Sequence, residues 1–113
     1  IWKSTDGIEW NLVAPSTDIF GPRYSHTATV HNNKVWIVGG VTGPLDETHI
    51  DFWYSENMED WTEYDGPLPA TEGLIQHAAL SYNEELWLFG GLQPNASGSA
   101  FITGEIRSIK EEE

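Results

Sequence analysis

The stretch Lys34-Val-Trp-Ile-Val-Gly-Gly40 returns 51 residues later as Glu85-Leu-Trp-Leu-Phe-Gly-Gly91. The same offset relates all six tryptophans of the chain to one another: Trp2 to Trp53, Trp10 to Trp61, and Trp36 to Trp87. A rare, large residue does not fall three times at one offset by chance, so the chain is built from repeats. A repeat of this length is a supersecondary unit that buries its apolar face against a neighbouring copy.

The first complete copy of the repeat has the pattern of four short antiparallel strands. Residues 25–30 and 34–38 flank Asn32-Asn33, and asparagine tolerates the positive φ angles of a tight hairpin turn. Residues 51–55 and 61–64 supply the third and fourth strands. No stretch of helical periodicity exceeds two turns, so the predicted fold class is all-β.

The second copy predicts three strands, at residues 76–82, 85–89 and 103–109, and no fourth strand with its tryptophan. We expect the third strand to slip by two residues relative to the first copy. In that alignment Ser108 takes the place of Ser55, and Ile106 takes the place of Trp53.

The N-terminal segment resembles the end of an earlier copy. Residues 1–4 and 10–13 are predicted strands joined by Asp6-Gly7, and Asp-Gly is a strong hairpin signal. We therefore expect one partial domain in four parts, which are the end of a preceding unit at 1–13, a complete unit at 24–64, an incomplete unit at 75–109 and an acidic tail at 110–113. Nine strands do not divide into four-stranded units, which favours a piece of a larger assembly over closure by oligomerisation.

The composition is that of a globular, strongly acidic chain. Of the 113 residues 39% are hydrophobic, and 18 acidic residues against 5 basic ones give a formal charge of −13. Such a surface repels phosphate backbones and anionic lipid headgroups, so we expect no nucleic-acid partner. No run of 18 apolar residues occurs, which argues against membrane insertion. The absence of cysteine excludes disulfides and thiolate metal sites.

Four apolar positions before a double glycine, followed by a Tyr and a Trp with six residues between them, form a pattern that resembles the kelch repeat. Residues 35–40 with Tyr54 and Trp61 carry this pattern in full, and residues 86–91 carry its first half. Residues 4–10 also resemble a hairpin of bacterial galactose-oxidase-like kelch proteins. The chain is thus similar to that branch of the family, with two repeats.

The resemblance implies a β-propeller, in which each four-stranded antiparallel sheet is one blade and several blades surround a channel. Two blades with overhanging strands form a partial propeller and leave apolar faces uncovered. The expected partners for these faces are the remaining blades of the same propeller or other copies of the chain. The likeness to bacterial proteins favours a periplasmic, cell-surface or secreted location over a cytoplasmic one.

The tryptophans and paired glycines are interpreted as structural residues. Identical placement in successive copies is what packing between blades requires, so five tryptophans are expected in the core: Trp10, Trp36, Trp53, Trp61 and Trp87. Gly39-Gly40 and Gly90-Gly91 are expected where a buried strand turns or packs closely. Together with Tyr54 these residues make up the predicted structural motif, and the glycines do not match a phosphate-binding loop.

Histidine offers the first candidate for ligand contact. His26 and His77 are equivalent in the repeat, so they lie on different blades, and we expect them to hydrogen-bond neighbouring loops. His49 lies between the second and third strands, close in sequence to Asp46, Glu47 and Asp51, and is a candidate ligand-binding residue. We interpret the acidic cluster as a solvated loop, so no metal and no cofactor are predicted.

Arg23 and Tyr24 are the other candidate ligand-binding residues. They lie where the chain enters the first complete unit, on a connector expected to line one face of the ring. Arginine is rare in this chain, which favours a specific role, and internal hydrogen bonding by Arg23 is the alternative. No Ser-His-Asp or Cys-His order is legible, so no catalytic residue is assigned.

The predicted function is a non-catalytic binding module that recognises a protein or a glycan through its loops. The alternative is a fragment of a carbohydrate-acting kelch enzyme, similar to a sialic-acid mutarotase or a galactose oxidase. A copper-radical oxidase needs a tyrosine cross-linked to cysteine, which this chain lacks. A mutarotase needs converging charges, for which Arg23 is the one obvious donor. A non-enzymatic role is therefore favoured.

Overall fold

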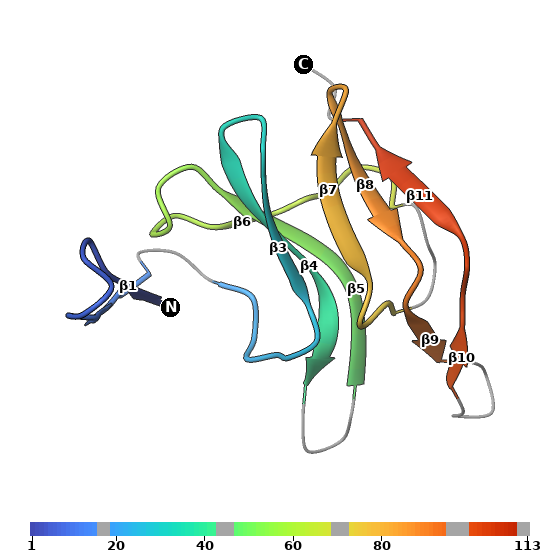
Figure 1. The fold of residues 1–113 in the computed structure, drawn as a ribbon, viewed down its shortest axis with the longest axis horizontal. Helices are drawn as coiled ribbons and strands as arrows, with labels where there is room; N and C mark the ends of the chain where they lie inside the picture. Colours follow the sequence, from blue (N-terminus) through green and yellow to red (C-terminus); the bar gives the residue numbers. More distant parts are fainter. Residues whose placement is uncertain (16–18, 43–46, 69–72, 95–99, 111–113) are drawn as a thin grey trace.

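The computed structural model describes residues 1–15, 19–42, 47–68, 73–94 and 100–110 (Figure 1). Within these ranges the chain forms eleven strands and no helix, which confirms the all-β prediction. The described ranges contain no helix long and apolar enough to cross a bilayer.

The first sheet has four antiparallel strands in the order β3-β4-β5-β6 (Figure 1). Their bounds are β3 (Thr27–His31), β4 (Lys34–Thr42), β5 (Glu47–Ser55) and β6 (Thr62–Glu63). In the turn between β3 and β4, Asn32 and Asn33 have φ angles of 52° and 59°. The predicted hairpin is therefore confirmed, with both turn residues in the left-handed region.

The second sheet has three strands in the order β7-β8-β11, and a two-stranded arm extends from it. The bounds are β7 (Ala78–Tyr82), β8 (Glu85–Phe89), β9 (Leu92–Pro94), β10 (Ala100–Ile102) and β11 (Ile106–Ile109). The strand count exceeds the predicted nine because the second and third strands of this copy are each broken in two. In the first sheet the corresponding strands run on, with a register irregularity between Val38 and Gly40.

The register of β11 differs from the predicted one by a residue. Ile109 lies opposite Leu86, as Ser55 lies opposite Val35, so the slip is three residues rather than two. A shift of one residue reverses which side chains face the core. The observed register buries Ile109 and Arg107, whereas Ile106 points outward.

The N-terminal hairpin of β1 (Trp2–Lys3) and β2 (Asn11–Leu12) stands apart from both sheets (Figure 1). Among the described residues, these strands pair with each other and with no further strand. Trp10 is 57% exposed, although it was predicted in the core, whereas its counterpart Trp61 is 4% exposed. The prediction fails for Trp10 because no described sheet faces the hairpin.

The core lies between the facing surfaces of the two sheets. The first sheet contributes Trp36, Val38 and Phe52, the second contributes Leu86, Leu88 and Ile109, and Leu74 enters from the connector between them. Full burial of one such side chain stabilises the fold by about 1.5–3 kcal/mol. Trp53 and Trp87, also predicted in the core, are half-buried.

Polar contacts join the inner strands β3 and β7 beside this core. Thr27 Oγ1 and His77 Nε2 are 2.7 Å apart, and His31 Nδ1 and Ser81 Oγ are 2.7 Å apart. His77 thus hydrogen-bonds the neighbouring sheet. These contacts fix how the two sheets align along their inner edge, because each requires one strand position opposite another.

Candidate functional site

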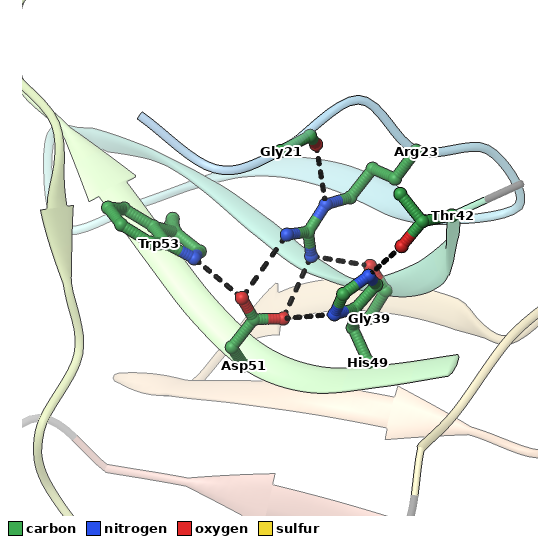
Figure 2. Close-up of polar contacts among 7 residues, drawn as sticks. All are labelled: Gly21, Arg23, Gly39, Thr42, His49, Asp51 and Trp53. Atoms are coloured by element: carbon green, nitrogen blue, oxygen red, sulfur yellow. Dashed lines mark hydrogen bonds and ion pairs between the residues drawn. The ribbon is translucent and has the colours of Figure 1, made fainter. Parts of the chain in front are cut away.

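Arg23 and His49, two of the three predicted ligand-contact residues, are brought together around Asp51 (Figure 2). The Arg23 guanidinium donates to both Asp51 carboxylate oxygens, at 2.8 and 3.2 Å. It also donates to the carbonyl oxygens of Gly39 at 3.0 Å and Gly21 at 3.2 Å. The Arg23 side chain is 2% exposed, and the bidentate geometry makes this a strong, directional pair.

Aromatic residues pack beside this ion pair. The Arg23 guanidinium carbon lies 5.5 Å from the centre of the Phe20 ring, and Phe20 packs edge-on against Trp53 and Trp61. The Trp53 indole N–H donates to Asp51 at 2.7 Å. The cluster therefore ties the connector before β3 to the middle of β5.

His49 lies within β5, not between the second and third strands as predicted, because β5 begins at Glu47 and pairs Gly40 with His49. From there His49 extends the cluster toward the end of β4. Its Nε2 hydrogen-bonds Thr42 Oγ1, and its Nδ1 lies 3.9 Å from Asp51 Oδ1. The order Thr42, His49, Asp51 is that of a nucleophile, a base and an orienting acid. However, 3.9 Å exceeds a hydrogen bond, and Asp51 is already engaged by Arg23 and Trp53, so the geometry does not support triad catalysis.

The charge state of the cluster follows from its contacts. Burial raises the pKa of Asp51, but hydrogen bonds from Arg23 and Trp53, with the Arg23 and His49 charges, bring that pKa below its ordinary value. Burial lowers the pKa of His26, and the nearby Arg23 charge lowers it further. At neutral pH the Asp51 carboxylate and the Arg23 guanidinium therefore lie near the neutral imidazole of His26. This arrangement is suited to stabilising the fold rather than to transferring protons.

Gly39 and Gly40 let two connectors cross the same point of the first sheet. Both have positive φ, at 67° and 105°, and a Cβ on Gly39 would overlap the Leu74 carbonyl oxygen. The Gly40 N–H donates to that carbonyl at 3.0 Å, and the Leu74 N–H donates to the His49 carbonyl at 3.0 Å. Only glycine combines this backbone conformation with such close approach.

Tyr24, the third predicted ligand-contact residue, lies beside the cluster rather than in it. Its backbone forms an antiparallel bridge with Val41, through hydrogen bonds of 2.9 and 2.8 Å. The residue is 53% exposed, so its side chain is presented to solvent at the edge of the Arg23 cluster. The ligand-contact assignments of Arg23, Tyr24 and His49 remain predictions.

Cation binding has no support among the residues that can be described. Asp46 lies outside them, as does the side chain of Glu47. Across the described part of the chain, no three His, Cys, Asp or Glu side chains form a group that could hold a metal ion.

Sequence reasoning did not identify Asp51 as the partner of Arg23, or Thr42 as the partner of His49. Arg23 and Asp51 are 28 residues apart, and no short-range spacing rule relates them. One signal was available, because the second copy has Leu74 where the first has Arg23. A missing arginine predicts a missing or rebuilt acidic partner in that copy.

A family model described as the Kelch motif matches residues 22–54, from the start of the Arg23 connector to the end of β5. Residues 22–54 are a kelch motif. With the antiparallel sheets, this match identifies the fold as blades of a kelch-type β-propeller. The Arg23 cluster joins the two ends of the kelch motif, since Arg23 opens the matched range and Asp51 lies near its close.

Two curated relatives are similar to this chain over more residues than the motif spans. The chain is 31% identical over 90 residues to the tRNA wybutosine-synthesizing protein 2/3/4 of Oryza sativa subsp. japonica, a match covering 79% of this chain. It is 30% identical over 83 residues to the Leucine-zipper-like transcriptional regulator 1 homolog of Drosophila melanogaster, covering 66% of this chain. The matches span 8% of the length of each relative.

Proposed function

We propose that this chain acts as a kelch-type protein-interaction module without catalysis of its own. The observation that carries the proposal is the kelch motif at residues 22–54, whose polar cluster is arranged to hold a connector in place. Propellers host many unrelated activities, so the partner must be sought at the surface of this chain rather than inferred from the fold.

The proposed contact surface is the end of the first sheet where β4 finishes and β5 begins. Tyr24 is exposed there, and His49 is a quarter exposed at its side chain. Arg23 serves this surface as a positioning residue, because its ion pair with Asp51 fixes the connector that carries Tyr24. Exposed tyrosines on a rigid scaffold are frequent anchors of protein interfaces.

The proposal includes the domain organisation. Residues 24–64 form a complete blade, 75–109 an incomplete second kelch repeat, 1–13 the end of a preceding blade and 110–113 an acidic tail. Support for the second repeat comes from its backbone, because Ile75 bridges Leu92 as Tyr24 bridges Val41. Gly90 and Gly91 also have positive φ, like Gly39 and Gly40.

We propose a protein rather than a glycan as the partner. Neither relative is named as a carbohydrate-acting enzyme, and both names belong to much longer proteins. The finer assignment to a galactose-oxidase-like bacterial branch rests on residues 4–10 alone. There Asp6 accepts backbone hydrogen bonds from Ile8 and Glu9, as Asn57 does from Glu59 and Asp60. This shared turn geometry supports a structural role for the hairpin and does not favour a sugar ligand.

Affinity purification with matched baits tests the proposal. The full chain, Tyr24→Ala and Tyr82→Ala are immobilised and exposed to an extract of the source cells, with a denatured chain as background. Tyr82 is a suitable control because it is 67% exposed on the second sheet. We expect a protein that the wild type and Tyr82→Ala retain and Tyr24→Ala recovers about tenfold less. Equal recovery by all three would overturn the location, and binding of the chain to a glycan array but to no protein would overturn the partner class.

A further inference from the structure

His77 is a buried titratable side chain that the proposed contact surface does not use. It directly precedes β7 and is 7% exposed, and a Cβ on Gly39 of the first sheet would lie 3.1 Å from its ring carbon Cε1. Its Nε2 lies 2.7 Å from Thr27 Oγ1 of β3, whereas its buried Nδ1 has no hydrogen-bond partner among the described residues. The ring is therefore held between the two sheets with one of its two nitrogens satisfied.

The charged groups near His77 oppose its protonation. Burial, with a smaller contribution from the charge of His26 on the connector before β3, lowers the pKa of His77 to about 4. Arg23 of the same connector lowers the pKa of His26, and the Asp51 carboxylate is paired with Arg23. The glycine and threonine that contact the His77 ring do not ionise. Within the described ranges, no carboxylate therefore offsets the cost of a proton on His77.

Protonation changes what the His77 ring requires from its surroundings. Both nitrogens of an imidazolium are hydrogen-bond donors. The Thr27 hydroxyl can accept a hydrogen bond from Nε2, but the Nδ1–H would become a buried, charged donor without an acceptor, which is strongly unfavourable. Water satisfies the protonated ring only after the ring leaves its place beside Gly39.

The segment that carries His77 is bonded to the residues that hold Tyr24. We call this segment, residues 73–77, the second connector. The Gly40 N–H donates to a carbonyl of the second connector, and an N–H of the connector donates to the Ser25 carbonyl, each at 3.0 Å. Gly40 and Ser25 directly adjoin Val41 and Tyr24, whose backbones form the antiparallel bridge. Release of the second connector therefore removes hydrogen bonds on both sides of that bridge.

We propose that His77 is a pH-sensitive switch, whose protonation releases the second connector from the first sheet and loosens the contact surface around Tyr24 while both sheets stay folded. The opening is a property of this chain alone, whereas its consequence for a bound protein rests on the proposed function. The ring binds its proton near pH 6.5 when released and near pH 4 when buried. Linkage then predicts that the open population rises about a hundredfold between pH 7 and pH 4.

Amide hydrogen exchange, followed by NMR on the full chain, tests the opening. Rates measured between pH 7 and pH 4 are corrected for the pH dependence of exchange in an unstructured peptide, so that they report how often each amide is exposed. We expect exposure of the Tyr24 and Gln76 amides to rise about a hundredfold and to be insensitive to low concentrations of urea. The Trp36 amide, in the centre of the first sheet, should be exposed less often at every pH and should respond to urea, because it exchanges through global unfolding.

Two results of this experiment would overturn the proposal. If the Tyr24 and Gln76 amides are exposed as rarely as the Trp36 amide, with the same response to urea, no separate opening exists. If their corrected exposure is unchanged between pH 7 and pH 4, protonation does not drive the opening.

A pair of histidine variants assigns the response to His77. His77→Gln should abolish the rise in exposure at Tyr24 and Gln76. His31→Gln, the same change at the far end of β3, where His31 lies 2.7 Å from Ser81 Oγ, should leave the rise intact. A rise that persists in His77→Gln, or one that disappears in His31→Gln, contradicts the assignment. If His77→Gln does not fold, NMR titration of the His77 ring in the wild-type chain decides, since proton uptake at the ordinary pH of 6.5 would reject the switch.

The switch and the proposed function fail separately. The exchange experiment needs no partner, so failure of the bait experiment at Tyr24 would reject the interaction module and leave the switch in place. Unchanged exchange at the Tyr24 amide, together with a protein whose retention depends on Tyr24, would reject the switch and leave the interaction module in place.

Discussion

In the first sheet, Arg23 of the connector binds Asp51 of β5, whereas in the second sheet Arg107 of β11 binds Glu105 just before that strand. Arg107 also donates to Gln93 at 2.9 Å. Both pairs lie beside the paired glycines of their own sheet. The arginine has thus changed its element, from the connector to the third strand, whereas the acid lies within β5 in the first sheet and just before β11 in the second.

The exchange changes what each ion pair holds. Asp51 is 24% exposed at its side chain and receives two hydrogen bonds from Arg23, whereas Glu105 is 69% exposed and receives one from Arg107. Leu74 replaces the connector arginine in the second copy and is fully buried against the first sheet. The two copies therefore share a backbone arrangement although the same connector position forms an ion pair in one copy, through Arg23, and an apolar contact in the other, through Leu74.

The tryptophan counterparts in β4 and β8 offer the largest test of this comparison. Trp36 has no exposed surface, and Trp87 is half-buried on an open face. We expect Trp36→Ala to lower the free energy of unfolding by about 4 kcal/mol and Trp87→Ala by about 1–2 kcal/mol. Urea denaturation of both variants measures the difference, and equal losses would mean that the second face is covered in solution.

Replacing the acid of each ion pair should reveal how much each pair contributes to stability. Asp51→Asn leaves the Arg23 charge buried, so we expect a loss of about 2–3 kcal/mol in the free energy of unfolding. Glu105→Gln affects a largely exposed acid and should cost less than about 1 kcal/mol. Thermal unfolding of the two variants provides the check. A larger effect at Glu105 would contradict the assignment of Arg23 as the main tie.

Acid should weaken the contact between β3 and β7, which includes Thr27 and His77 and is called the seam below. Burial lowers the pKa of His77 to about 4, with a further contribution from His26, and its Nδ1 has no hydrogen-bond partner within the described ranges. In the unfolded chain His77 binds a proton near pH 6.5, whereas in the folded chain it does so only near pH 4. The contribution of neutral His77 to the free energy of unfolding is therefore fully present above pH 6.5 and falls by about 2–3 kcal/mol as the pH drops to 4.

A pair of variants at the seam isolates this effect. His77→Gln should remove most of that pH dependence, whereas Thr27→Val, which deletes the hydrogen-bond partner of His77, should lower stability without removing it. Denaturation curves collected between pH 7 and 4 supply the measurement. An unchanged pH profile in His77→Gln would exclude His77 as the titrating group.

The smallest expected effect concerns the two equivalent hairpin turns. Gly7 and Met58 occupy the same turn position, with φ angles of 76° and 68°. A side chain in this conformation is strained. We therefore expect Met58→Gly to raise the free energy of unfolding by about 0.5–1 kcal/mol and Gly7→Met to lower it by a similar amount. Chemical denaturation of both variants would show the opposite signs. Loss of stability in Met58→Gly would mean that packing by the methionine side chain outweighs the strain.

Much of the fold was predictable because the repeat supplies it twice. The offset that pairs Trp36 with Trp87 located the hairpins and the paired glycines, and all four strands of the first sheet overlap their predicted ranges. However, β4 continues to Thr42 and β5 begins at Glu47, in a stretch that was not predicted as strand. The register of β11 was not predictable in the same way. Matching Ser108 to Ser55 satisfied the sequence, but burial of Ile109 selects the neighbouring register.

The candidate site was predictable only in its members. Arg23 could be singled out because arginine is scarce in this chain, and His49 because acidic residues lie near it in the sequence. Their meeting at Asp51 depends on how β4 and β5 pair. Trp10 was misplaced for a related reason, since a repeat position predicts burial only where a neighbouring sheet is present. Local patterns fix the elements, whereas contacts between distant residues depend on the assembled sheet.

The connector that crosses the first sheet at Gly40 determines which segment of this chain could be grafted intact into another protein. Leu74 is hydrogen-bonded to Gly40 and His49 of the preceding sheet, and the Gln76 N–H donates to the Ser25 carbonyl at 3.0 Å. The portable unit of the first sheet therefore extends from Pro22 through Gln76 rather than ending with β6. A graft that stops at residue 64 would include all four strands but would lose the hydrogen bonds that Leu74 and Gln76 of the next connector form with them.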